Sequence, residues 1–97
     1  MRFEVILAPE AIEDLRRLNA RERSTVRRAI ETHLRQAPTK TSRTRIKRLR
    51  GLSRPQYRLR VGEVRVFYDV SASAVEVLAI MAKSEAEKRL AEFGGSQ

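Results

Sequence analysis

The stretch that decides the fold is Pro55–Asp69, PQYRLRVGEVRVFYD, in which apolar residues alternate with arginines on both sides of a Gly-Glu step. Alternation with a period of two is typical of a β-strand that buries one face. Because a type II′ turn places glycine first in a two-residue loop, the sequence predicts a β-hairpin that turns at Gly62-Glu63.

A two-residue turn also sets the pairing of the two strands. From the turn outward, the predicted pairs are Val61 with Val64, Arg60 with Arg65, Leu59 with Val66, Arg58 with Phe67 and Tyr57 with Tyr68. Successive side chains point to opposite faces. One face is expected to be core and carries Tyr57, Leu59, Val61, Val64, Val66 and Tyr68. The other is named the arginine face, is expected to be open to water, and carries Arg58, Arg60, Arg65, Phe67 and Asp69.

The arginine face points to a function because its charges repel one another. Arg60 directly opposite Arg65 destabilises an antiparallel pair. A bound anion reverses that cost, since guanidinium groups stay charged and grip phosphate with two hydrogen bonds. The sequence therefore favours a phosphate clamp, with an exposed Phe67 as a surface on which a base stacks. The alternative is a structural ion network, in which Asp69 or acids from elsewhere in the fold neutralise the arginines.

The net charge of +9 is confined to one part of the chain. Residues 40 to 65 hold ten basic residues and one acid, and the remaining positions hold 11 of each sign. Such clustering is typical of a surface that meets a polyanion, although a solvated charge run has the same composition. Besides the hairpin arginines, the residues expected to bind RNA are Lys40, Arg43, Arg45, Lys47, Arg48, Arg50, Arg54 and Phe67.

Length and composition limit the class of protein. A chain of 97 residues forms one domain, 1–97, with a single core. The absence of cysteine excludes disulfides and thiol chemistry. The longest apolar run, Val77–Ala82, is far shorter than the about 20 residues of a membrane span, and the acids near the N-terminus do not suit a signal peptide. We expect a soluble cytoplasmic protein.

The remaining patterns predict an α+β domain. A β-rich run over 2–8 ends at Pro9, which suits the first turn of a helix to about residue 19. Asn19 and Glu22 then resemble the capping box of a second helix that runs to about residue 36. After a basic connection with room for a short strand and after the hairpin, residues 74–82 indicate a central strand and 83–93 a final capped helix. The order β-α-α-β-β-β-α predicts a mainly antiparallel sheet, with the N-terminal strand and the helical hairpin packed on one face.

This order, the segment 46–52 (IKRLRGL) and above all the hairpin segment 57–68 (YRLRVGEVRVFY) resemble the RelE/ParE superfamily of toxins from type II toxin-antitoxin systems. The resemblance covers nearly the whole chain and implies a toxin that a cognate antitoxin protein holds inactive. RelE-like members of the superfamily enter the ribosome and cut messenger RNA, whereas ParE-like members poison DNA gyrase. The RelE-like branch is favoured, which implies an mRNA endoribonuclease that inhibits translation.

Resemblance to RelE-like enzymes also implies catalytic residues, namely Arg58, Arg60, Arg65 and Lys83. The sequence departs from the family pattern at its C-terminal end. Ser84 stands where an arginine is common, and Leu90 or Phe93 occupies the neighbourhood of the usual tyrosine.

The missing tyrosine leaves the proton chemistry open. Cleavage of RNA by its own 2′-hydroxyl needs a proton acceptor, a proton donor and positive charge at the phosphate. Arginine supplies only the charge. The candidates for the acceptor are Lys83 with a pKa lowered by burial, Asp69, an outward-turned tyrosine and groups of the ribosomal RNA.

Two further features carry a structural interpretation. His33 lies on the apolar stripe of the second helix and is interpreted as a packed or half-exposed structural histidine, not as a catalytic residue. With one histidine, no cysteine and no clustered acids on the arginine face, we expect a metal-independent reaction without a cofactor.

The C-terminal helix, predicted over 83–93, either closes the core through Ala86, Leu90 and Phe93 or moves aside for an antitoxin helix. Two other functions stay open beside the endoribonuclease. They are a ParE-like gyrase inhibitor, which the missing tyrosine favours, and a non-catalytic module that binds RNA or the ribosome.

Overall fold

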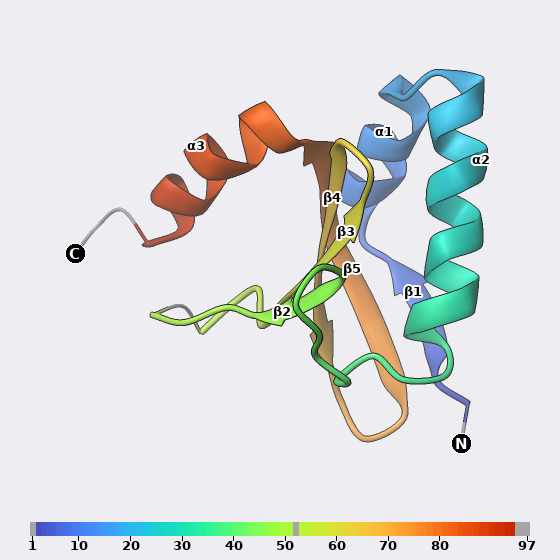
Figure 1. Ribbon diagram of the computed structural model, residues 1–97, viewed down its shortest axis with the longest axis vertical. Helices are drawn as coiled ribbons and strands as arrows, with labels where there is room; N and C mark the ends of the chain where they lie inside the picture. Colours follow the sequence, from blue (N-terminus) through green and yellow to red (C-terminus); the bar gives the residue numbers. More distant parts are fainter. Residues whose placement is uncertain (1, 52, 95–97) are drawn as a thin grey trace.

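The computed structural model describes residues 2–51 and 53–94, with side chains described as far as residue 92. Its elements are β1 (Glu4–Leu7), α1 (Pro9–Arg17), α2 (Ala20–Ala29), a π-helical turn η1 (Ile30–Leu34), β2 (Ile46–Arg48), β3 (Tyr57–Val61), β4 (Val64–Val70), β5 (Ala74–Ala82) and α3 (Lys83–Gly94). Figure 1 shows α1 and α2 on one side of the sheet and α3 projecting from the other. The predicted α+β class is confirmed, and the element order agrees except that the short strand β2, for which the basic connection had room, adds a fifth strand.

The five strands lie in the order β1-β5-β4-β3-β2, so β1 and β2 form the two edges of the sheet. β1 runs parallel to β5, and the other neighbouring strands are antiparallel. β5 lies inside the sheet and contacts α1 and α3. Burial of the strand from several directions explains the nearly continuous apolar run of its sequence.

The hairpin of β3 and β4 has the predicted register, with Arg60 opposite Arg65 and Tyr57 opposite Tyr68. Its turn is Gly62-Glu63, where Gly62 has φ of +59° and no non-glycine residue of the described chain has a positive φ. A type I′ turn needs positive φ at both central residues, so the turn is compatible with type II′ only.

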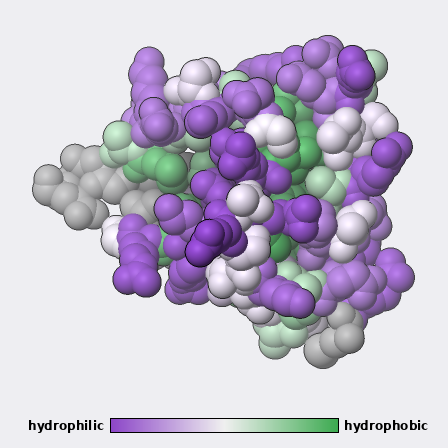
Figure 2. Space-filling model, in the orientation of Figure 1, coloured by the Kyte–Doolittle hydropathy of each residue, from purple (hydrophilic) through white to green (hydrophobic). Residues whose placement is uncertain are grey.

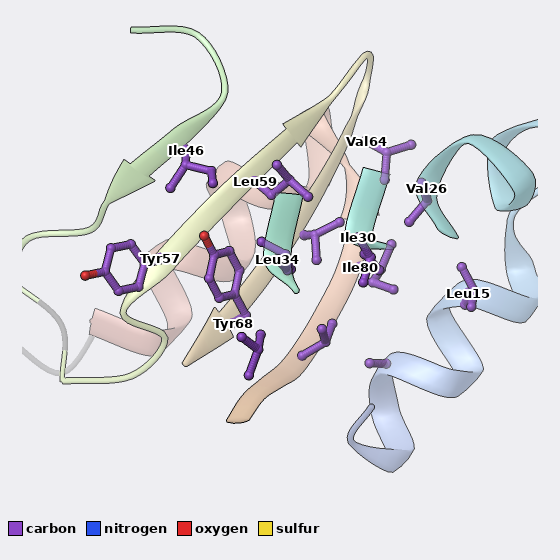
Figure 3. Close-up of a cluster of buried hydrophobic side chains, with 14 residues drawn as sticks. Leu15, Val26, Ile30, Leu34, Ile46, Tyr57, Leu59, Val64, Tyr68 and Ile80 are labelled. Atoms are coloured by element: carbon purple, nitrogen blue, oxygen red, sulfur yellow. The ribbon is translucent and has the colours of Figure 1, made fainter. Parts of the chain in front are cut away.

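The apolar face of the hairpin packs beneath the helices and forms the main core (Figure 3). α1 contributes Ala11 and Leu15, and the second helical segment contributes Val26, Ile30 and Leu34. The strands contribute fully or nearly fully buried residues, among them Ile46, Tyr57, Leu59, Val64, Val66, Tyr68, Val75, Val77 and Ile80. The predicted core face is therefore confirmed.

The second helix begins as predicted and ends differently. The Asn19 side-chain oxygen accepts a hydrogen bond of 2.8 Å from the backbone N–H of Glu22, which caps the first turn. The last turn is not α-helical as expected but is the wider π-helical turn η1. Ile30 and Leu34 stay buried, and His33 is half-buried at the end of the turn.

A second, smaller apolar cluster lies on the arginine face and overturns one expectation. Phe67 was expected to be exposed, but none of its surface is accessible. It packs with Ala79 and Met81 of β5, Ala86 and Leu90 of α3, and Leu49 after β2. α3 therefore covers part of the face that was expected to be open, because the apolar side chains of Phe67, Ala79 and Met81 there also need burial. The side chain of Phe93 lies outside the described residues.

The visible surface is largely hydrophilic. Figure 2 shows hydrophilic residues over most of the visible face, with apolar residues in small patches between them. None of the helices in the described chain combines the length and the apolar character that crossing a membrane requires.

Candidate functional site

The three hairpin arginines come from adjacent strands and have unequal exposure. Arg60 on β3 is exposed, and its partner across the strands is Arg65 on β4. Arg58, two residues before Arg60 on the same face, is half-buried. Arg65 is only 5% exposed, so the expectation that all three would be open to water is wrong for this residue. The small apolar cluster beside it explains the burial, since Met81 lies directly opposite Arg65 on β5.

Arg65 is anchored to the hairpin turn by its own guanidinium. Nη1 donates hydrogen bonds to the carbonyl oxygens of Gly62 (2.8 Å) and Val64 (3.1 Å). Burial and the neighbouring Arg60 lower the pKa of Arg65, whereas Glu63 acts in the opposite direction. An arginine nevertheless keeps its charge at any physiological pH. Arg65 therefore places a positive charge at a fixed position that is largely shielded from water.

Arg58 carries an unused hydrogen-bond donor. Its Nε is buried and has no hydrogen-bond partner among the described residues. Burial lowers the pKa of Arg58, and the charges of Arg65 and Arg60 lower it further. A buried donor without a partner costs about 1–3 kcal/mol, so the free protein holds this group at an energetic cost. Within the described chain, none of the three arginines forms an ion pair with a carboxylate.

Two lysines extend the positive charge of the arginine face. Lys47 on β2 pairs in register with Arg58 and is exposed. Lys83, at the start of α3, donates a backbone hydrogen bond of 2.7 Å to the carbonyl oxygen of Glu63. It therefore lies beside the turn that anchors Arg65. Its side chain is exposed, so the burial that would suit it as a proton acceptor is absent.

The acids of this face lie at its opposite end and are already engaged. Asp69 accepts a hydrogen bond of 2.8 Å from Nε of Arg54 and one of 2.7 Å from the backbone N–H of Gln56. Glu76 accepts one of 3.3 Å from the same Arg54. The ion network proposed as an alternative thus exists, but it neutralises Arg54 and not the hairpin arginines. Arg54, which the sequence placed among the RNA-binding residues, is thus engaged in two ion pairs within the chain.

Neither tyrosine is available for proton transfer at the arginine face. Tyr57 and Tyr68 stack on the core face with ring centroids 5.5 Å apart (Figure 3). The Tyr68 hydroxyl donates a 2.6 Å hydrogen bond to the carbonyl oxygen of Pro38, and burial, together with Tyr57, raises its pKa well above the ordinary value. The predicted parity of both residues is confirmed.

The other predicted RNA-binding residues surround β2. Arg48 lies over the Tyr57 ring, with the guanidinium carbon 5.0 Å from the ring centroid, in a cation–π contact. The rest are exposed, namely Lys40, Arg43, Arg45 and Arg50.

Sequence analysis gave no role to Gln56, which helps to hold the chain before β3 against the end of β4. Its side-chain oxygen accepts a hydrogen bond of 2.9 Å from the backbone N–H of Val70. A single glutamine before a strand carries no recognisable signal for such a contact.

The fold is similar to solved structures of RelE-like toxins. The RelBE2 toxin-antitoxin complex of Mycobacterium tuberculosis matches with a TM-score of 0.73 and 23% identity, over 84% of this chain and 99% of that one. The RelE-RelB complex of Pyrococcus horikoshii OT3 gives 0.69 and 20% over 86% and 97%. The DinJ-YafQ complex of E. coli gives 0.68 and 9% over 88% and 97%.

The family follows from sequence. A family model described as the ParE toxin of the type II toxin-antitoxin system parDE matches residues 5–87. The chain belongs to this family and is a type II toxin of the RelE/ParE superfamily. Comparison with curated protein sequences gives no significant match.

Proposed function

We propose that this toxin is a ribosome-dependent endoribonuclease that cuts messenger RNA and so inhibits translation. One observation carries the proposal: three guanidinium groups gather at the turn end of the arginine face without a carboxylate partner in the described chain. One of them also keeps a buried donor unused. A phosphate bound there supplies both the missing negative charge and the missing acceptor.

In the proposed mechanism the arginines bind the scissile phosphate and stabilise the charge that develops on it. Arg65 is fixed in advance by its bonds to the turn, so it needs no reorganisation when the transition state forms. Exposed Arg60 guides the incoming strand, and the Arg58 side chain turns as the strand binds, so that its Nε, buried in the free protein, reaches a phosphate oxygen. Arginine does not exchange protons. Groups of the ribosome therefore accept the proton, and the exposed ammonium group of Lys83 beside the turn adds charge or donates a proton.

The proposed partners are a cognate antitoxin protein and the ribosome with its messenger RNA. The similar structures from Mycobacterium tuberculosis, Pyrococcus horikoshii and E. coli are all toxin-antitoxin complexes. An antitoxin that supplies carboxylates to the three arginines would satisfy the same unmet charge and block the site.

The test is to map the 5′ ends of cellular transcripts after brief induction of the toxin. We expect new ends within coding regions, phased with the reading frame, and none after induction of an Arg65→Ala variant. Intact transcripts in cells whose growth has stopped would overturn the proposal. Salt-dependent RNA binding without cuts would also overturn it, and would leave a non-catalytic RNA-binding protein.

Inhibition of DNA gyrase is the second candidate function, because the matching family model is that of ParE toxins. Supercoiling of relaxed plasmid by purified gyrase separates the two candidates. The endoribonuclease leaves supercoiling unchanged at concentrations that stop translation, whereas a gyrase inhibitor blocks supercoiling and leaves transcripts intact.

A further inference from the structure

A pocket of about 250 Å³ lies between η1 and the segment that leads into β2. Its walls include His33 from η1 and Lys40, Thr41, Ser42 and Arg45 from the connecting segment, and Ile46 contributes its apolar wall. Figure 1 shows this segment, drawn in green, running from the foot of the second helix to β2. The lining combines two cations, an imidazole and several hydroxyl groups, and includes no carboxylate.

The positive charges of the pocket have no counter-charge. Lys40 and Arg45 are exposed, and neither forms an ion pair within the described part of the chain. Burial, followed by the charge of Arg45, lowers the pKa of His33. At neutral pH the free protein therefore holds a neutral imidazole beside positive charges. A bound anion would offset the repulsion among these charges.

The backbone of the pocket is held in a defined shape. The Ser42 Oγ accepts hydrogen bonds from the backbone N–H groups of Arg45 (2.9 Å) and Ile46 (3.4 Å), and the Ser42 N–H donates to the carbonyl oxygen of Ile46 (2.9 Å). The carbonyl oxygen of Arg45 accepts a 2.8 Å bond from the N–H of Arg60, which ties the turn to β3. Since the Ser42 oxygen acts as acceptor in both contacts, its hydroxyl hydrogen remains for a ligand.

The pocket is separate from the arginine face. Ile46 belongs to the main core together with Leu59, so the wall it forms belongs to the helix side of the sheet. The next residue, Lys47, pairs with Arg58 and points to the other side. The edge strand β2 thus has a cationic site on each side.

We propose that this pocket binds a phosphate group, with Lys40 and Arg45 supplying charge and with His33 and the Ser42 hydroxyl donating hydrogen bonds. The phosphate belongs either to a polynucleotide backbone or to a free phosphate, because both present the same oxygen atoms. The proposal goes beyond the proposed function, since it requires neither RNA cleavage nor gyrase inhibition. It also gives His33, interpreted from sequence as a structural histidine, a role in binding.

Phosphate binding is expected to change the protonation of His33. The charged groups that line the pocket with this imidazole are Lys40 and Arg45, and burial and the charge of Arg45 disfavour its protonation. A phosphate between them favours the imidazolium, so binding raises the pKa of His33 and strengthens as the pH falls.

The test uses the full chain and NMR of the imidazole, which is unambiguous because His33 is the sole histidine. The imidazole shifts are followed against pH without ligand, with inorganic phosphate, and with an oligouridine octamer that lacks terminal phosphates. We expect the pKa of His33 to rise with bound phosphate. A response to the octamer assigns the site to a polynucleotide backbone, and a response to inorganic phosphate alone assigns it to a free anion.

Arg45→Ala and Arg28→Ala form a matched pair of variants, since Arg28 is an exposed arginine on α2 outside the pocket and the change in charge is the same. Loss of a charged hydrogen-bonding group predicts about tenfold weaker binding at His33 for Arg45→Ala and little change for Arg28→Ala. The proposal is overturned if neither probe shifts the pKa of His33 in the unmodified protein, or if the two variants respond alike. Since the readout is independent of transcripts, its failure is distinguishable from failure of the proposed function.

Discussion

The two ends of the arginine face differ in whether their arginines form ion pairs. At the end away from the turn, Arg54 lies between Asp69 and Glu76 and forms an ion pair with each. At the turn end, Arg58, Arg60 and Arg65 crowd together without a carboxylate partner in the described chain. The first arrangement balances the charge of Arg54 within the fold, and the second leaves positive charges without an ion-pair partner among the described residues.

We infer that this difference separates residues that stabilise the fold from residues held for function. Paired side chains lower the free energy of the folded protein, so their replacement affects stability. A crowded, partly dehydrated cation with an unpartnered donor, such as Arg58, raises it, so its replacement affects activity and leaves stability equal or higher. The variants below test that separation, beginning with the largest expected effect.

Arg65→Ala is expected to reduce mRNA cleavage about 10²–10³-fold, the usual cost of removing one preorganised group that stabilises developing charge. The measurement is the frequency of new transcript 5′ ends together with growth after induction. Arg54→Ala removes the same charge from the paired end of the face and should keep cleavage within a few-fold. Equal losses in the two variants would contradict the division between the ends.

Tyr68→Phe is expected to destabilise the domain by about 2 kcal/mol, because the carbonyl oxygen of Pro38 loses its buried hydrogen-bond donor. Urea denaturation measures the change. Cleavage by the folded variant should be unchanged, since the hydroxyl lies on the core face. A folded Tyr68→Phe variant without cleavage activity would instead assign the proton chemistry to this tyrosine.

Asp69→Asn is expected to lower the free energy of unfolding by about 1.5 kcal/mol, through weaker bonds to Arg54 and the Gln56 N–H. Thermal melting checks this value, and activity below the melting transition should persist. A stability equal to that of the unmodified protein would show that the paired end is no more structural than the turn end.

In the ligand-free protein, His33→Gln has the smallest expected effect, confined to the pH dependence of stability. Burial and Arg45 hold the pKa of His33 in the folded protein below the unfolded value. The unfolded chain therefore binds the proton more readily, and stability declines as the pH falls below about 6.5. The variant should flatten this decline in urea titrations between about pH 7 and about pH 5. A decline of the same slope in His33→Gln would assign the pH dependence to other groups.

The hairpin could be predicted in detail because its turn and its strand register depend on residues that are close together in the chain. The position of Gly62 and the alternation of side chains determine the pairing of Arg60 with Arg65 and the inward position of both tyrosines. Asn19 likewise predicted the start of a helix, because it caps the backbone N–H of a residue only three positions further along the chain. Each of these features depends on residues that are close together in the chain or directly paired.

What the sequence could not predict depends on contacts between distant segments. Burial of Phe67 requires α3 and Leu49 to meet over it, and alternation within one strand says nothing about such a cover. Recruitment of Asp69 by Arg54, rather than by the hairpin arginines, depends on the path of the chain before β3. The pocket around His33 also needs the connecting segment to fold back on η1.

The most direct measurement is the stability of Arg58→Met, compared with the unmodified protein at low salt and in parallel with growth inhibition. Methionine keeps the apolar stem and removes both the unpartnered Nε and the repulsion from Arg60 and Arg65. We predict a melting temperature equal to or up to about 5 °C above that of the unmodified protein, with growth inhibition lost. A lower melting temperature with growth inhibition retained would show that Arg58 serves the fold, and would contradict a functional cluster at the turn.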